Sequence, residues 1–212
     1  LGMTWGRAMH EFVEQLAKDE RLRSLSFQNV KVVPFLGTPG AIQSDSWNTT
    51  TYSNTLATKV GNLLHCASYN LSAPMYVEGT KEKELIESID EIAKVLHMAE
   101  TADIALIGIG SMQDDSSIIK AEIRTKEEYK ELVRKGAVGE IVGRIYDKNG
   151  QTVDEDLKRK MVGISLDKIA KIPVRVGMSY GKDKIEAIKG AIAGGLVNVL
   201  VTDVPTAELL LK

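Results

Sequence analysis

The sequence predicts an α/β fold: a doubly wound, mostly parallel sheet with helices on both faces and a small antiparallel appendage. Short apolar or β-branched runs alternate with amphipathic helical patterns along the chain. The run over 102–109 is apolar on both faces, which is typical of a parallel strand that helices cover on both sides. Residues 174–202 read as strand, helix and strand, and such units are almost always parallel and right-handed.

The first half of the chain is expected to open with the end of a strand, Leu1-Gly2-Met3-Thr4. A natural domain rarely begins in mid-strand, so we expect an upstream part to be missing. Turn residues at 37–40 and at Pro74 separate the segments that follow. By periodicity these are a helix over 9–17, a buried strand over 30–35, a helix over about 48–65 and a short strand over 67–71.

In the second half, the turn at Asp147-Lys148-Asn149-Gly150 predicts a hairpin that includes 141–146, because Asn-Gly is the strongest short hairpin signal. This hairpin belongs to the antiparallel appendage, which we place near 137–164. With no internal repeat or disordered linker, residues 1–212 are expected to form one domain. The other predicted elements are a helix over 81–98, a strand over 102–109, a polar helix over 125–134, a strand over 174–178, a helix over 182–193, a strand over 196–202 and a helix over 206–211.

Composition excludes several classes of function. The net charge is −2 and the sequence pI is about 6.0, so the chain as a whole has no electrostatic attraction to DNA or to a membrane. If the protein regulates transcription, another part must contact DNA. One cysteine, Cys66, fits a reducing cytoplasm. There is no apolar run of about 20 residues and no signal-peptide pattern, so we expect a cytoplasmic protein.

Candidate binding residues lie in four loops, because open α/β sheets bind ligands outside the carboxyl ends of their parallel strands. The loops are 4–7, 37–40, 108–111 and 179–184, and each follows a predicted strand. Glycines and helix N-termini in such loops attract anions. Lys184 falls in the first turn of its helix, where a cation opposes the helix dipole. It is therefore either a solvated surface lysine or a lysine that faces an anion.

Neither nucleotide-binding fingerprint is present. Gly108-Ile109-Gly110 lacks the rest of the dinucleotide pattern, and there is no P-loop. His10, His65 and His97 lie outside the glycine-rich loops, and Cys and His are too scattered for a zinc site. We expect no cofactor and no metal.

Several segments resemble the SorC family of bacterial transcriptional regulators. They are, in chain order, 5–7, 102–111, 136–141, 143–144, 176–188 and 198–203. The likeness runs through essentially the whole chain. It implies an effector-binding domain with a fold similar to sugar-phosphate isomerases and glucosamine-phosphate deaminases. It also implies an N-terminal helix-turn-helix domain upstream of Leu1, absent from this sequence.

The resemblance also implies binding roles. The family's phosphate lysine falls on Lys184, its first anion loop on 4–8 and its second on Gly37 and Thr38, with a polar contact near Asn48. Glu140 stands where members usually carry Asp, a hydroxyl acceptor. Arg7-Ala8 and Tyr180 depart from the family pattern, which leaves the effector and its phosphorylation open. Together with the loop glycines, the predicted ligand-binding set is Thr4, Trp5, Gly6, Arg7, Gly37, Thr38, Asn48, Gly108, Gly110, Glu140, Gly181 and Lys184.

Three functions are compatible with these residues. The first, which we favour, is a non-catalytic sensor of a sugar or sugar phosphate that modulates DNA binding and oligomerisation. Its partners would be the effector and, only through the absent domain, operator DNA; it would form a homodimer, and a tetramer when full length. The second is an isomerase or deaminase in which Glu140 and Asp203 supply acid–base chemistry. The third is a structural module that binds no metabolite.

Overall fold

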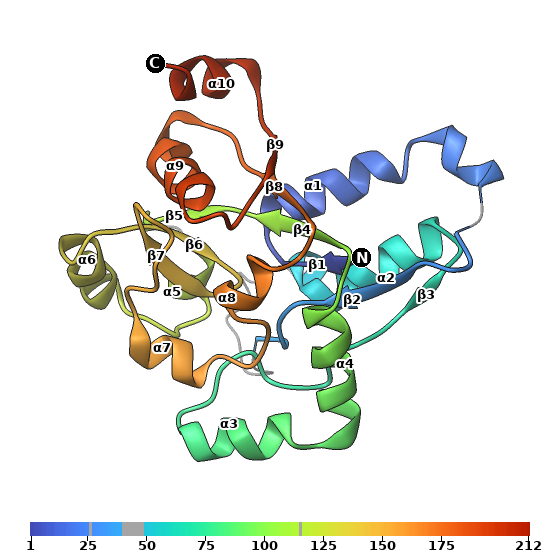
Figure 1. The fold of residues 1–212 in the computed structure, drawn as a ribbon, viewed down its shortest axis with the longest axis horizontal. Helices are drawn as coiled ribbons and strands as arrows, with labels where there is room; N and C mark the ends of the chain where they lie inside the picture. The colour runs from blue at the N-terminus through green and yellow to red at the C-terminus, as the bar shows by residue number, and fades with distance from the viewer. Residues whose placement is uncertain (26, 40–48, 115) are drawn as a thin grey trace.

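The computed structural model describes residues 1–25, 27–39, 49–114 and 116–212, and it contains two sheets (Figure 1). The larger sheet has six parallel strands in the order β3-β2-β1-β4-β8-β9, and the smaller is antiparallel in the order β5-β6-β7. These two sheets confirm the predicted doubly wound fold with an antiparallel appendage. The strands are β1 Gly2–Met3, β2 Lys31–Pro34, β3 Ala67–Ser68, β4 Ile104–Gly108, β5 Gly110–Ser111, β6 Ala137–Ile141, β7 Arg144–Asp147, β8 Val174–Met178 and β9 Val199–Val201.

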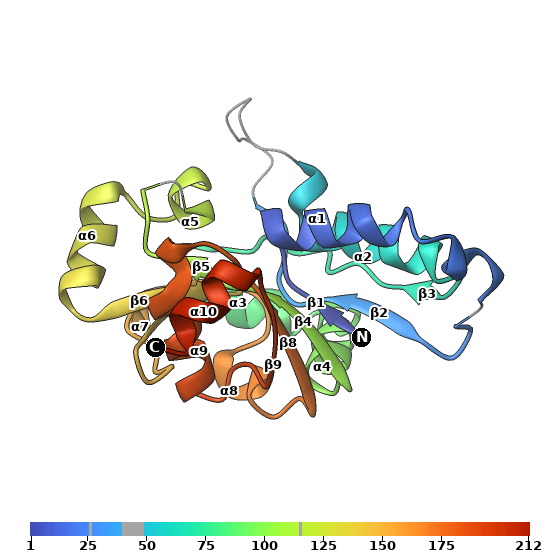
Figure 2. The same ribbon diagram turned by 90° about the horizontal axis from the view of Figure 1, so that it is seen from above.

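Helices cover both faces of the larger sheet. Figure 2 shows α1 and α2 on one face and α4 on the other. Met9 and Val13 of α1 are buried in an apolar cluster together with Met3 of β1 and Leu56 of α2. The helices are α1 Arg7–Leu16, α2 Ser53–Leu63, α3 Thr80–Glu87, α4 Asp90–Glu100, α5 Ser117–Lys120, α6 Lys126–Arg134, α7 Glu155–Lys160, α8 Leu166–Ile169, α9 Ile185–Ala193 and α10 Val204–Leu210, with 3-10 turns η1 Glu20–Ser24, η2 Thr49–Thr51 and η3 Lys182–Lys184.

The strand order reverses between β1 and β4. From β1 the chain moves outward to β2 and β3, then returns to place β4, β8 and β9 on the other side of β1. Such a reversal leaves an opening between the loops that leave two neighbouring strands in opposite directions. The loops after β1 and β4 are two of the predicted binding loops.

The helix predicted over 81–98 is two helices, so that prediction was wrong in one respect. α3 ends at Glu87, and Ile89 takes an extended conformation before α4 begins at Asp90. The break lets α3 contact α7 while α4 packs against β2. Asp90 and Glu91 in the first turn of α4 favour its separate start by interacting with the helix dipole.

The hairpin turn also differs from its predicted place. The strand predicted over 141–146 is divided by a two-residue turn at Val142 and Gly143, whose φ angles are 55° and 67°. The burial of Val142 offsets the strain of a β-branched residue at positive φ. The segment 147–150 does form a turn, in which the Asp147 carboxylate accepts from the backbone N–H groups of Asn149 and Gln151, both at 2.9 Å.

The remaining predicted elements are found with shifted ends. The last helix begins at Val204 rather than at 206, and the strand predicted over 67–71 is the two-residue β3. The predicted start of the second helix, near Asn48, lies outside the described residues.

The antiparallel sheet is fastened to α9. The buried hydroxyl of Tyr146, on β7, donates to the carbonyl oxygen of Ala187 at 2.9 Å. The turn after β7 meets the end of α9 where Gly150 and Gly194 face each other. Because β6 carries Glu140 and the chain just before α9 carries Lys184, these contacts fix the two residues relative to each other.

Candidate functional site

A cleft of about 360 Å³ lies at the carboxyl ends of β1, β4 and β8, where the strand order reverses. The loops 5–8, 108–111 and 179–184 contribute most of its lining. The antiparallel sheet adds Glu140, and the start of α5 adds Ser116 and Ser117. The cleft therefore combines residues from both sheets.

Lys184 lies in this cleft, and its side chain is only 20% exposed. Its ammonium group donates to Ser111 Oγ at 2.8 Å and lies 3.5 Å from a carboxylate oxygen of Asp183. The Ser111 hydroxyl in turn donates to Asp183 at 3.3 Å. Lys184 is thus a partly buried and hydrogen-bonded lysine rather than a fully solvated one.

Glu140 is a buried carboxyl at the edge of the same cleft. It accepts hydrogen bonds from the backbone N–H of Gly143 and from the Trp5 side chain. Burial raises the pKa of Glu140, although these two donors and the charges of Lys184 and Arg144 act in the opposite direction. A Cβ atom at Gly110 would lie 2.8 Å from a Glu140 carboxylate oxygen, so glycine allows the carboxyl its place.

Apart from the apolar Ala8 and Ile109, the other lining side chains are cationic, aromatic or hydroxylic. Arg7, at the start of α1, is exposed and adds a second cation. Trp5 is buried, whereas Tyr180 is 58% exposed. Serine hydroxyls line the remainder, at positions 111, 116, 117 and 179. Such a set can hold a polyhydroxylated molecule that carries an anionic group.

The structure brings most of the predicted binding residues together. Those that line the cleft are Trp5, Gly6, Arg7, Gly108, Gly110, Glu140 and Lys184. Thr4 and Gly181 lie behind the lining and support it. The Thr4 hydroxyl accepts from the backbone N–H of Gly108 at 2.8 Å, and the N–H of Gly181 donates to Thr206 Oγ1 at 2.8 Å.

Gly37 and Thr38, from the predicted second loop, are not among the described residues that line the cleft. The N–H of Gly37 donates to the Val162 carbonyl at 3.2 Å, and that of Thr38 donates to the Ala73 carbonyl at 2.9 Å. These bonds tie the loop to the chain around residues 73 and 162. Asn48, the polar contact predicted beside this loop, lies outside the described residues.

Sequence reasoning missed several lining residues. Ser111, Ser179, Tyr180 and Asp183 lie in loops that were predicted, but only their neighbours were selected. Ser116 and Ser117 carried no usable signal, because the four-residue helix α5 was not predicted and only the tertiary fold places it over the cleft.

Of the two carboxylates that the enzyme alternative requires, only Glu140 is among the described residues that line the cleft. Asp203 accepts from the backbone N–H of Thr206 at 3.0 Å, caps α10 and is not among the lining residues.

Within the described ranges, no three His, Cys, Asp or Glu side chains come together in a way that could hold a metal ion. The same ranges contain no helix with the length and hydropathy of a membrane span.

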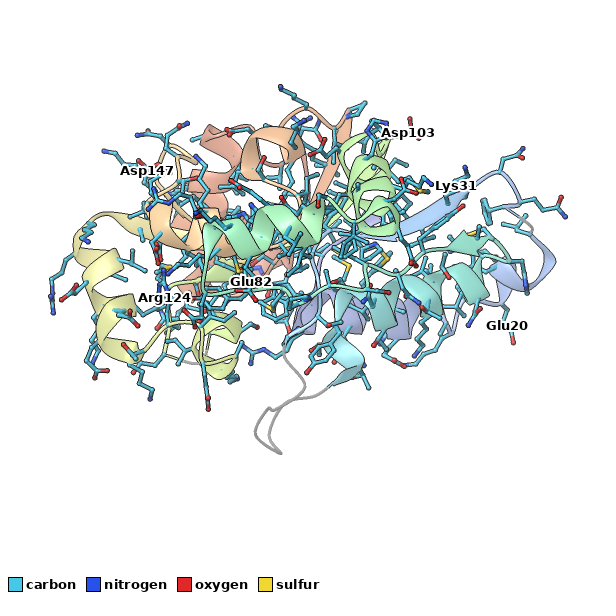
Figure 3. The ribbon with its side chains drawn as sticks, turned by 90° about the horizontal axis from the view of Figure 1, so that it is seen from below. Glu20, Lys31, Glu82, Asp103, Arg124 and Asp147 are labelled. Carbon is cyan, nitrogen blue, oxygen red and sulfur yellow. The ribbon has the colours of Figure 1, made fainter. Side chains whose placement is uncertain are left out.

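A second cleft, of about 340 Å³, lies near the amino ends of β1, β2 and β4. Lys31 and Asp103, both labelled in Figure 3, are among its lining residues. Parallel sheets of this kind bind ligands at the opposite end, and none of the predicted binding residues is present here. The cleft at the carboxyl ends is thus the candidate site.

Comparisons with known proteins give a consistent result. The family model "Sugar-bind: Putative sugar-binding domain" matches residues 1–212. The sorbitol operon regulator of Klebsiella pneumoniae is 30% identical over 214 residues, which cover 100% of this chain and 64% of that protein. The transcriptional regulator LsrR of Escherichia coli is 35% identical over 159 residues, 73% of this chain and 50% of that protein. The chain thus spans between half and two thirds of the length of these relatives.

Solved structures of transcriptional regulators are also similar to this chain over almost its whole length. The full-length sorbitol operon regulator SorC of Klebsiella pneumoniae matches with a TM-score of 0.86 and 31% identity, over 100% of this chain and 64% of that one. A DeoR family transcriptional regulator of Listeria monocytogenes matches with a TM-score of 0.84 and 25% identity, over 99% of this chain and 78% of that one. These proteins are named as transcriptional regulators rather than enzymes, in agreement with the prediction of a non-catalytic domain.

Proposed function

The chain belongs to this family of sugar-binding domains, in agreement with its resemblance to SorC-type regulators, and on that premise we propose that the cleft binds a sugar or a sugar phosphate. The observation that carries the proposal is the convergence of Lys184, Arg7 and Glu140 on one cleft at the strand-order reversal. Lys184 and Arg7 suit an anionic group, and the buried carboxyl of Glu140 suits sugar hydroxyls.

The binding set that we propose consists of the lining residues together with Thr4 and Gly181, which hold two of the loops in place. We leave Gly37 and Thr38 out of it, because neither is among the described lining residues. The set includes Ser111 and Asp183, because both contact Lys184 directly.

We further propose that the domain, residues 1–212, is the effector-binding part of a cytoplasmic transcriptional regulator. A chain with a net charge of −2 supplies no general attraction to DNA, so operator contact falls to a helix-turn-helix region outside these residues. A ligand that prefers one homodimeric or tetrameric arrangement shifts the population toward it and thereby changes DNA affinity.

A thermal-shift screen against sugars and their phosphates tests this function. A ligand present at about a hundred times its Kd adds about 2.7 kcal/mol of stability, which corresponds to roughly 5–11 °C for a chain of this length. We expect at least one sugar or sugar phosphate to produce such a shift. A broad panel in which none does, or steady turnover of a stabilising sugar phosphate, would overturn the sensor proposal.

A further inference from the structure

Asp183 belongs to the proposed binding set, but the proposed function does not explain why a carboxylate lies in a cleft that binds an anionic group. Its carboxylate accepts a hydrogen bond from Ser111 at 3.3 Å and lies 3.5 Å from the Lys184 ammonium. Ser111 Oγ also accepts from Lys184 at 2.8 Å. The three side chains form a closed triangle inside the cleft, and the charges of Lys184 and Asp183 offset each other.

We propose that the Asp183 carboxylate competes with the anionic group of the ligand for Lys184 and Ser111, and so sets how much charge a ligand must carry to bind. The inference rests on the proposed function and assigns a specificity-determining role to a residue outside the predicted binding set.

The hydrogen bonds of Ser111 support the exchange. A serine hydroxyl has one hydrogen to donate, and Ser111 donates it to Asp183. A ligand oxygen that is to receive this hydrogen and to approach Lys184 must replace the carboxylate. The side chain of Asp183 is 48% exposed on the short turn η3, so it can rotate into water once replaced.

The exchange discriminates between ligands by charge. A phosphate group restores the negative charge next to Lys184 that the departing carboxylate removes, and its several oxygens accept from both Lys184 and Ser111. A neutral hydroxyl restores none of that charge. Glu140, the other carboxyl of the cleft, does not compete in this way, because it accepts from Gly143 and Trp5 instead.

The test is an NMR or calorimetric titration of the 212-residue domain with inorganic phosphate. Asp183→Asn removes the charge but keeps an amide oxygen that can accept from Ser111. We expect Asp183→Asn to bind inorganic phosphate about tenfold more tightly than the wild-type chain, because a like charge within a few ångströms of the anion is gone. Lys184→Gln should abolish the binding.

Glu186→Gln is the matched control. Glu186 lies in the first turn of α9 with its side chain 73% exposed, and the substitution changes the net charge by the same amount. We expect its phosphate affinity to stay within about twofold of wild type. Equal affinity of Asp183→Asn and wild type, or an equal gain in Glu186→Gln, would refute the competition.

A failure of this inference differs from a failure of the proposed function. If neither the wild-type chain nor Asp183→Asn binds inorganic phosphate, the competition is refuted. The sensor proposal then still stands if any sugar or sugar phosphate stabilises the domain in the thermal-shift screen, and it falls with the inference if none does. Thermal unfolding of each variant without ligand establishes that the substitutions leave the domain folded.

Discussion

Replacement of Gly150 by alanine tests how the antiparallel sheet is held against α9. Gly150 has a φ of 74°, and a Cβ atom there would lie 2.5 Å from the Cα atom of Gly194 and 3.2 Å from the carbonyl oxygen of Gly190. Both neighbours are backbone atoms of the end of α9, which cannot move aside as a flexible side chain can. The turn after β7 and the end of α9 must therefore separate, or the turn must change conformation.

The cost has two parts. A left-handed backbone costs a residue with a Cβ atom about 1–2 kcal/mol. Overpacking against a close neighbour costs about a further 1–3 kcal/mol. We expect Gly150→Ala to lower the free energy of unfolding by about 2–5 kcal/mol, measured by urea denaturation.

Gly195→Ala separates these two contributions. Gly195 has a φ of 65°, but a Cβ atom there would meet nothing within 4 Å. We expect it to show only the backbone cost, about 1–2 kcal/mol. Because Gly150 helps to fix Glu140 relative to Lys184, Gly150→Ala should also weaken ligand binding, whereas Gly195→Ala should not. Equal losses of stability in the two variants would refute the argument from close packing.

Three further predictions concern single side chains. Burial raises the pKa of Glu140, so the protonated carboxyl contributes to the free energy of unfolding below about pH 4, and that contribution is lost as the pH rises through the raised pKa. Urea denaturation should therefore show Glu140→Gln to be more stable than wild type at pH 8 but not at pH 4. Arg124→Met leaves the 7%-exposed carboxylate of Asp154 without its 2.9 Å ion pair, and chemical denaturation should show a loss of about 3–5 kcal/mol. Tyr180→Ala, at an exposed position, should change the free energy of unfolding by less than about 0.5 kcal/mol while calorimetry shows weaker sugar binding.

The fold and much of the cleft could be predicted from sequence because both follow simple rules. The apolar run around β4 and the strand–helix–strand pattern around α9 determine a parallel sheet. The carboxyl-end rule then selects the loops after its strands, which is how Trp5, Arg7 and Lys184 were found before the structure. Glu140 was selected only through the family resemblance, since its place in the cleft depends on the pairing of β6 with β5.

What was missed depends on tertiary packing. The helix break at Ile89 follows from the different surfaces that α3 and α4 cover. The spacing of apolar residues over 81–98 does not indicate this break. The turn at Val142 and Gly143 competes with a stronger Asn-Gly signal a few residues later, and a buried valine at positive φ is not a turn residue by composition. Ser116 and Ser117 reach the cleft only because the chain after β5 folds back over it.

The most direct test of the central claim is calorimetric titration of the best sugar phosphate from the screen into the wild-type chain, Lys184→Gln and Lys189→Gln. Lys189, on α9 and outside the cleft, is a half-exposed control residue of equal charge. We expect at least about a tenfold loss of affinity in Lys184→Gln, the scale of one charge-assisted hydrogen bond, and no change in Lys189→Gln. Equal affinities in all three proteins would contradict this expectation, because the ligand would then bind somewhere other than this cleft.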